Sequence, residues 1–372
     1  MKNTKLRFLA LLLVLVMVLC ACEMPAIPTN STNPHNPTNS QNPTNPQSPT
    51  NPQNPTNPQN PTDPTGTPTE PQGTLPPAPA TEHQDDDGDE ICDHCGIDVT
   101  VELDFYAFND LHGVFMDTAE NPGLDELTTY LKNAYADEAS YEILLSSGDM
   151  WQGTVESSSN TGQLMTQWMN HMGFVAMTLG NHEFDWGSRY IAENAKIAEF
   201  PFLGINVTDS NVTESYCQSS VIVERGGVKI GIIGAMGNVL SSISDEHSGG
   251  LDFAVRHELT QMVKDEAIRL RQEGCHFIVY SIHAGHDNAY PGIKDMYGDL
   301  GYYDIDLSDG YIDLVFEGHT HQRYIIRDEH GVYHLQGNSS NKGLSFANVC
   351  YNLVTNTYEV ETTDILKQGR TC

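Results

Sequence analysis

Positive charge is scarce in this chain of 372 residues. Lysine and arginine together number 18 against 50 aspartates and glutamates, which gives a formal net charge of −32 at pH 7. A surface of this sign repels polyanions and lacks the basic footprint of a nucleic-acid-binding protein. The composition therefore argues against long DNA or RNA as a partner.

A hydrophobic run long enough to remain in a membrane is also lacking. The only extended run, Phe8 to Leu19, is too short to span a bilayer and follows three basic residues, which is typical of a secretion signal. It ends in Leu19-Cys20-Ala21-Cys22, which resembles the cleavage box of bacterial lipoproteins. We expect residues 1–22 to be the signal peptide. Cys22 would then carry the lipid that anchors the protein at the extracytoplasmic face of the cell membrane, as its only membrane contact. An ordinary cleaved signal without lipid is the alternative.

Apolar residues are almost absent from the stretch that follows. From Asn30 to Pro77 the chain is nearly all Asn, Pro, Thr, Gln and Ser, so it offers nothing to bury in a core. We predict that residues 23–80 are a disordered tether. A proline-rich motif for a partner is the alternative, but no aromatic or basic residue marks a docking register.

Cysteine is sparse, with eight residues in the chain, and two of them lie in a short acidic segment, residues 81–99. Alternating carboxylates at Asp85, Asp87 and Asp89 suggest calcium, and the segment resembles short calcium-binding spacer repeats of secreted bacterial proteins. Cys92 and Cys95 have the spacing of a zinc or redox pair. Calcium binding, a small disulfide and a solvated linker all remain open.

Residues 100–372 are long enough for one domain with a substantial core. Apolar runs alternate with amphipathic stretches, which predicts an α/β layered fold. We expect strands at Leu103 to Asn109, Glu142 to Ser147, Phe174 to Leu179, Val228 to Gly234, Phe277 to Ile282 and Leu314 to Glu317. We expect helices near Leu124 to Tyr135, Gly162 to His171, Trp186 to Glu199 and Val255 to Glu273. The remaining apolar runs, from Tyr324 to Thr363, read as hairpins that form a second, partly antiparallel sheet.

Polar side chains of the metal-binding type follow five of these strands. They are Asp110, His112, Asp149, Asn181, His182, His283, His319 and His321. In open α/β sheets, ligands bind at the carboxyl edge of the strands, so residues far apart in sequence meet there. Glycines beside these residues allow tight turns and a close backbone approach: Gly113, Gly148, Gly153, Gly180 and Gly318.

Taken in order, the segments NDLHG, GDMWQG, GNHEFD, SIHAGH and GHTH resemble the motifs of calcineurin-like metallophosphoesterases. GNHEFD and the overall spacing are most similar to the catalytic domain of bacterial 5′-nucleotidases and of their UDP-sugar hydrolase and 2′,3′-cyclic phosphodiesterase relatives. The resemblance covers Thr100 to Thr363. It implies an αββα sandwich, in which two mixed sheets are flanked by helices.

The resemblance also implies two divalent metal ions. One would be held by Asp110, His112, Asp149 and His321. The other would be held by Asp149, Asn181, His283 and His319, so that Asp149 bridges the pair. Nitrogen donors mixed with carboxylate and amide oxygens suit Mn, Zn, Fe or Co. His283 is preferred to His286 because it follows the apolar run directly, and His286 is the alternative.

The expected reaction follows from the charge of the two metal ions. Two cations polarise the phosphoryl oxygens and lower the pKa of bound water, so that hydroxide is available for in-line attack on phosphorus. The resemblance places His182 where it would stabilise the transition state or protonate the leaving oxygen, with Asp185 orienting its ring. A cap on the following helix is the other role open to Asp185.

The predicted function is hydrolysis of a small nucleotide-like phosphate ester. The alternatives are a phosphodiesterase of cyclic nucleotides or wall-associated phosphodiesters, and a non-catalytic surface adhesin or metal-binding lipoprotein. Related nucleotidases recognise the base with a second, C-terminal domain, which we do not find before Cys372. Base recognition would then fall to the tyrosine-rich loop from Tyr290 to Asp306 or to a separate partner, unless the enzyme is unselective. Those tyrosines serve equally well as packing or surface residues.

Overall fold

The computed structural model describes residues 83–118, 122–134, 140–209, 217–254, 257–286, 310–328 and 330–365. The predicted signal peptide with Cys22, the predicted tether and the loop from Tyr290 to Asp306 lie outside these residues. Among the helices that are described, none combines the length and the apolarity needed to cross a bilayer.

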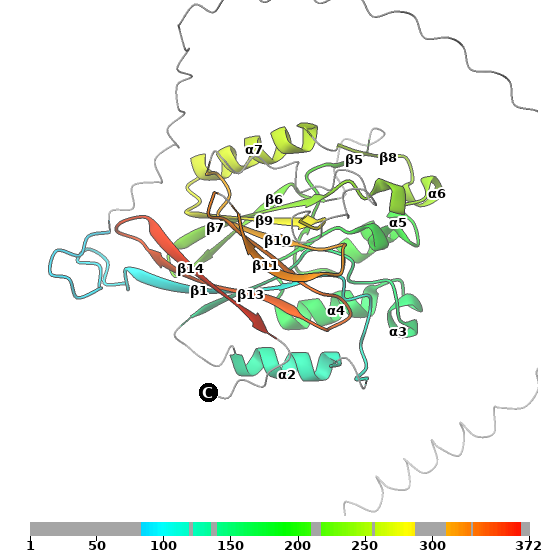
Figure 1. Cartoon of the computed structure of the whole chain (residues 1–372), viewed down its shortest axis with the longest axis horizontal. Helices are drawn as coiled ribbons and strands as arrows, with labels where there is room; N and C mark the ends of the chain where they lie inside the picture. Colours follow the sequence, from blue (N-terminus) through cyan, green and yellow to red (C-terminus); the bar gives the residue numbers. More distant parts are fainter. Residues whose placement is uncertain are drawn as a thin grey trace, which may run out of the picture. The chain divides into compact units, whose positions relative to one another are not determined.

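Two six-stranded sheets form the centre of the fold (Figure 1). The first sheet has the order β14-β13-β1-β2-β3-β4. Its parallel strands are β1 (Thr100–Phe108), β2 (Tyr141–Ser146), β3 (Ala176–Thr178) and β4 (Phe202–Leu203). Its antiparallel edge consists of β13 (Leu344–Asn352) and β14 (Thr357–Ile365).

The second sheet also combines four parallel strands with two antiparallel ones, in the order β11-β12-β10-β9-β7-β6. Its parallel strands are β7 (Val228–Met236), β9 (Phe277–His283), β10 (Leu314–Glu317) and β12 (Tyr333–Gly337). The antiparallel edges are β6 (Ser220–Arg225) and β11 (Arg323–Arg327). A separate two-stranded ribbon joins β5 (Val207–Asp209) to β8 (Leu251–Phe253).

Helices cover the outer face of each sheet. In Figure 1, α7 (His257–Gln272) lies on one side of the sandwich, whereas α2 (Leu124–Ala134) and α4 (Gln163–Met172) lie on the other. Apolar side chains of α2, α4 and α5 (Ser188–Ala195) pack against the first sheet, and those of α7 against the second. The short elements are α3 (Val155–Ser158), α6 (Asp245–Ser248), η1 (Asn181–Phe184) and η2 (Leu240–Ser242). The structure is therefore the predicted α/β sandwich with two mixed sheets.

Alternation along the central strands explains this layering. In β1, Leu103 and Phe105 face the core between the sheets, while Phe108 joins the core under the helices. The Phe105 ring lies 5.7 Å from the Phe277 ring of the opposite sheet, measured between centroids. Strands buried on both faces are typical of parallel sheets. Because the parallel strands run the same way, their carboxyl ends share one edge.

One predicted feature of the fold is wrong. The four C-terminal strands do not form a sheet of their own, because β13 pairs with β1 and β12 pairs with β10. The two hairpins instead extend one sheet each. Hydrophobic patterning identifies such strands but contains no information about their distant partners. The helix expected from Trp186 to Glu199 is also shorter, because α5 begins only after Gly187 and ends at Ala195.

Candidate metal centre

Loops that follow β1, β2, β3, β9 and β10 meet at the carboxyl edge of the two sheets. Two groups of donor side chains form there, and within each group the donor atoms lie within 4.8 Å of one another. We call Asp110, His112 and His321 the outer group. We call Asp149, His283 and His319, together with Asn181, the inner group.

The outer group presents three acceptor atoms to one point. His112 Nε2 lies 3.1 Å from His321 Nε2, and His321 Nε2 lies 3.3 Å from Asp110 Oδ1. His112 Nδ1 donates to the Gln152 carbonyl at 2.9 Å, which leaves the Nε2 lone pair facing its neighbours. Lone pairs brought together in this way are stabilised by a shared cation.

The inner group is more deeply enclosed. His283 Nδ1 donates to the Ser147 carbonyl at 2.7 Å, so Nε2 faces Asp149 Oδ2 and Asn181 Oδ1, each at 3.1 Å. His319 Nδ1 lies 2.9 Å from the same Asn181 oxygen. The nitrogen and oxygen donors therefore fit a divalent metal of borderline hardness.

Asp149 is held by hydrogen bonds that fix both carboxylate oxygens. Its Oδ1 accepts from the His182 backbone N–H at 2.7 Å, while Oδ2 faces His283. Its carbonyl accepts from the His112 backbone N–H at 3.0 Å, which ties the β2 loop to the β1 loop. Asp149 therefore belongs to the inner group through its side chain and contacts the outer group through its backbone.

Protonation in the centre reflects burial and crowded carboxylates. Burial opposes ionisation of Asp149, but the adjacent His283 holds the pKa of this carboxyl below its usual range. Burial alone would lower the pKa of His283, whereas Asp149 and Asp110 raise it to about 10. Burial and then His283 lower the pKa of His319 to about 4, and burial lowers that of His112. Of these three histidines, only His283 has a pKa that favours the protonated form.

Five of the seven predicted ligands have a left-handed backbone, which is rare for residues other than glycine. Their φ values are 50° for Asp110, 52° for His112, 56° for Asp149, 69° for His319 and 54° for His321. Strained backbone of this kind persists only where the surroundings determine it, and it gathers at functional sites.

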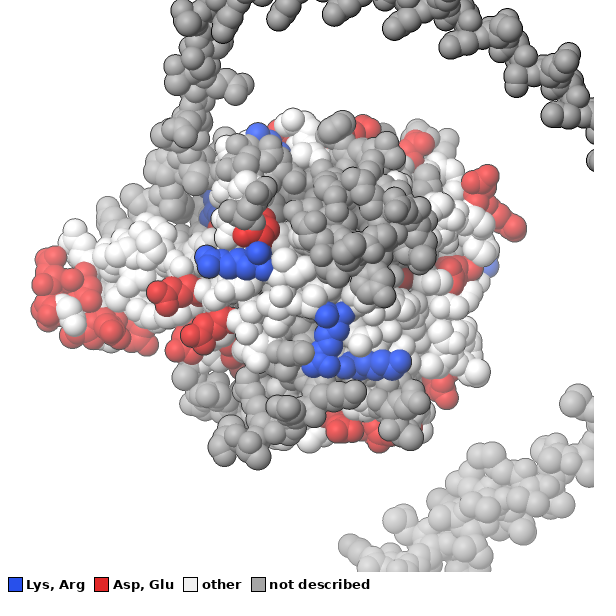
Figure 2. All heavy atoms as spheres, in the orientation of Figure 1, with Lys and Arg blue, Asp and Glu red and all other residues white. Residues whose placement is uncertain are grey.

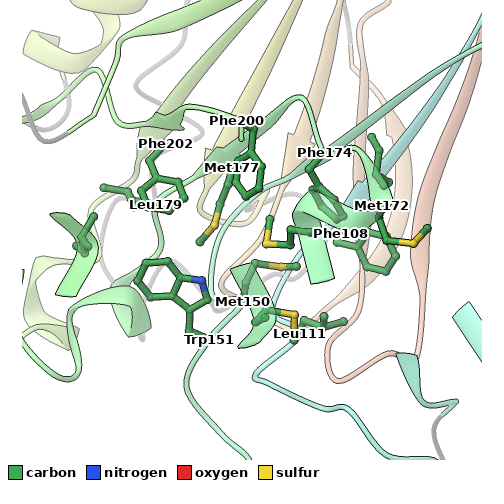
Figure 3. Packing of buried hydrophobic residues seen from close by; sticks show 14 of the residues in the cluster. Phe108, Leu111, Met150, Trp151, Met172, Phe174, Met177, Leu179, Phe200 and Phe202 are labelled. Atoms are coloured by element: carbon green, nitrogen blue, oxygen red, sulfur yellow. The ribbon is translucent and has the colours of Figure 1, made fainter. Parts of the chain in front are cut away.

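Packing supplies part of that support. Leu111 and Met150 directly follow the ligands Asp110 and Asp149, and Trp151 comes next after Met150; all three are buried in the core beneath the helices (Figure 3). The ligand loops are therefore anchored by their own apolar neighbours.

Glycine is required at two places where loops approach closely. A Cβ at Gly180 would lie 2.3 Å from Asp149 Oδ1, and one at Gly148 would lie 2.6 Å from His283 Nδ1. Both substitutions would displace a ligand.

His182 and Asp185 form a pair at the edge of the centre. His182 Nδ1 lies 2.8 Å from Asp185 Oδ2, and this hydrogen bond, rather than burial, raises the pKa of His182 to about 9. The residue that precedes α5 is Gly187, so Asp185 does not cap that helix. The His182 ring lies 5.1 Å from the His112 ring and keeps 35% of its side chain exposed. The His182 side chain can therefore contact a molecule bound in the metal centre.

Glu183 was not predicted as a site residue, although it lies within GNHEFD. Its carboxylate is fully buried and accepts from the backbone N–H groups of Asp149, Met150 and Gly180 at 2.8 to 2.9 Å. Burial and then Asp149 raise its pKa to about 7. The only hint of this role in the sequence was the position of Glu183, two residues after the predicted ligand Asn181.

His286, the alternative to His283, lies elsewhere. Its ring packs against His334 with 4.7 Å between centroids, and its backbone N–H donates to Tyr324. Gln336, also not predicted, accepts from Gln322 N–H at 2.6 Å and donates to the Gly318 carbonyl at 2.9 Å. It thereby braces the loop that carries His319 and His321.

Two further donor groups lie in the acidic segment before β1. Asp85, Asp87 and Asp89 form one, and His83, Cys92 and Cys95 form the other. Both cysteines are free thiols, so the disulfide that the sequence left open as one alternative is not formed in this structure. Burial would raise the pKa of Cys92, but hydrogen bonds from the Gln84 backbone and the His83 ring, among others, lower it to about 6.

A two-sheet α/β sandwich with paired Asp, His and Asn donors at one edge is typical of metallophosphoesterases. The chain belongs to the calcineurin-like phosphoesterase family, a class of hydrolases, and the matched residues are 103–323. This confirms the family inferred from the five motifs.

Among the named relatives are an apyrase and 5′-nucleotidases. An apyrase of Tabanus yao is 31% identical over 59% of this chain and 39% of its own length. A 5′-nucleotidase of Vibrio cholerae is 29% identical over 60% of this chain and 41% of its own. The chain thus spans less than half the length of these relatives. Among solved structures, the calcineurin-like phosphoesterase YfkN of Bacillus subtilis shares the fold, with a TM-score of 0.58, 20% identity and coverage of 71% of this chain and 90% of its own.

Proposed function

We propose that this chain hydrolyses small nucleotide-like phosphate esters with the help of two divalent metal ions. The observation that carries the proposal is the contact between the two groups. The Asp149 carbonyl accepts from the His112 backbone N–H at 3.0 Å, and the Asp110 carboxylate accepts from the His319 backbone N–H at 2.9 Å. Asp110, His112 and His321 would hold one ion, Asn181, His283 and His319 the other, and Asp149 both. When bound, the ions would polarise the phosphoryl oxygens and make hydroxide available near neutral pH.

The protein's own residues prepare the centre for this reaction. Backbone carbonyls of Ser147 and Gln152 fix the orientation of His283 and His112, so the metal-facing nitrogens need no rearrangement. His182, oriented by Asp185, would donate a proton to the leaving oxygen or stabilise charge on the phosphoryl group. Glu183 would keep the Asp149 loop in its strained conformation.

A nucleotide monoester is the substrate class we favour, because several curated relatives are named 5′-nucleotidases or an apyrase. The acidic composition agrees with a small substrate attracted locally by metal ions rather than with a polyanion. How a base would be recognised stays a prediction, because the loop from Tyr290 to Asp306 lies outside the described residues and a separate partner is untested.

A hydrolysis panel tests the proposal. AMP, UDP-glucose, 2′,3′-cAMP and bis-p-nitrophenyl phosphate would be offered with Mn or Zn to the wild type and to Asp149→Asn. We expect the wild type to turn over AMP best and the variant to turn over nothing. A preference for the two diesters would favour the phosphodiesterase alternative, and no turnover of any compound would favour the adhesin.

We also propose that the protein is anchored at the extracytoplasmic face of the membrane through a lipid on Cys22. The support is the basic start, the short apolar run and the position of this cysteine. Palmitate labelling that depends on Cys22 would agree, and release of an unlabelled soluble form would contradict it. Calcium at Asp85, Asp87 and Asp89 remains a prediction, because no observation beyond the carboxylates themselves points to the ion.

A further inference from the structure

A further group of possible metal ligands, one that includes two cysteines, lies outside the metal centre in the segment from His83 to Val99. Figure 1 shows this segment beside the start of β1, and Figure 2 shows acidic side chains gathered over it. His83 Nδ1 lies 3.4 Å from Cys92 Sγ and 3.4 Å from Cys95 Sγ. Three side chains therefore converge on one point.

These distances agree with a tetrahedral site. Zinc bonds of about 2.3 Å to sulfur and about 2.0 Å to nitrogen place neighbouring donors about 3.5 Å apart. A disulfide would use only the two sulfurs and would not explain why the imidazole nitrogen faces both. Calcium prefers oxygen donors, so this cluster does not suit it.

The backbone holds the three donors in place. Gly96 has a φ of 71°, and its N–H donates to the Cys92 carbonyl at 2.8 Å, which turns Cys95 back towards Cys92. Asp93 N–H donates to the Gln84 carbonyl at 2.8 Å, which brings the chain next to His83 to the same turn. Cys92 is buried, with 1% of its surface exposed, whereas Cys95 is open to solvent.

We propose that His83, Cys92 and Cys95 form a separate binding site for a zinc-class metal ion, with water as the fourth ligand. The site joins the first described residues to the turn that leads into β1, where the Val99 carbonyl accepts from Leu353 N–H at 2.8 Å. Because binding energy of such a metal contributes directly to folding, the ion would stabilise the whole segment.

Cobalt substitution of the full chain, kept reduced, tests this proposal. Cobalt bound to thiolates gives a near-ultraviolet charge-transfer absorption that oxygen and nitrogen ligands do not give, so the metal centre around Asp149 does not interfere. We expect the wild type to show this absorption, Cys92→Ser and His83→Ala to lose it, and Asp149→Asn to retain it. Cys350→Ser is the matched control, since Cys350 is a free thiol on β13, and it should also retain the absorption.

Three outcomes would overturn the proposal. One is a cobalt-loaded wild type without the absorption, a result that does not depend on whether any variant folds. Another is an absorption that survives Cys92→Ser in a folded protein. The third is a Cys92–Cys95 disulfide found by peptide mapping of the protein isolated from its cells.

Discussion

The inner and outer groups of the metal centre share Asp149 as a neighbour but differ in their surroundings. Most inner donors are enclosed, since His283 is 0% exposed and Asn181 2%, and only His319 is partly exposed. In the outer group Asp110 is buried, but the His321 side chain is 47% exposed. The difference indicates that the inner position is fixed by the core of the protein, whereas the outer position is open to substrate and to metal exchange.

The largest effect should come from the residue that joins the two groups. Asp149→Asn removes the charge that both metal positions need, and we expect kcat/KM for AMP to fall on the order of a thousandfold or more. Asp252→Asn, an exposed change on β8, should leave kcat/KM unchanged. Wild-type activity in Asp149→Asn would show that the groups do not act together.

Metal affinity should show the difference between the inner and outer groups most clearly. His283→Ala opens a cavity in the buried position, and we expect metal affinity to fall by about 100-fold or more, with loss of thermal stability. His321→Ala should weaken affinity by about 10-fold with the melting temperature unchanged, because the side chain is half exposed. Titration calorimetry on both variants measures this, and equal losses would remove the distinction.

The His182 and Asp185 pair should affect chemistry and not metal content. We expect His182→Asn to lower kcat by about 100-fold for AMP, whose leaving group needs a proton, and far less for a p-nitrophenyl ester. Asp185→Asn should have a smaller effect in the same direction. A uniform loss across leaving groups, or a loss of bound metal, would assign His182 a different role.

Much of this centre was predictable because ligands follow strands. The apolar runs that end before Asp110, Asp149 and His283 are β1, β2 and β9, and parallel strands necessarily present their carboxyl ends at one edge. The pairing of β13 with β1 was not predictable, because pairing of distant strands depends on the assembled core. The left-handed backbone of the ligands was equally hidden, because Asp and His adopt it more often than most residues but still at only a small minority of positions.

The residues that hold the ligand loops in place were also not predictable from the sequence. Glu183 and Gln336 are ordinary polar residues in the sequence, and only the fold shows that they bind loop backbone. His283 and His286 are three residues apart, and only the structure shows that His283 faces Asp149.

The smallest expected effect concerns His334 on β12. Its partner Glu317 ends β10, just before the loop that carries His319 and His321. Burial alone would lower the pKa of His334, but Glu317, with Oε1 2.7 Å from its Nδ1, and Asp328 raise it to about 9. Because the unfolded value is about 6.5, the charged pair stabilises the fold fully below that pH and is lost as pH rises through 9.

The comparison is with His334→Gln, measured by chemical denaturation at several pH values. The wild type should be more stable by roughly 1 to 3 kcal/mol at pH 6, and the advantage should disappear above pH 9. A difference independent of pH would mean that His334 acts by packing alone.

Anomalous diffraction from crystals of manganese-loaded protein tests the central claim most directly. The account predicts two peaks that share the Asp149 carboxylate, one beside His112 and His321 and the other beside His283 and His319. A map with no peak at this edge of the sheets, or with a single ion out of reach of Asp149, would contradict it.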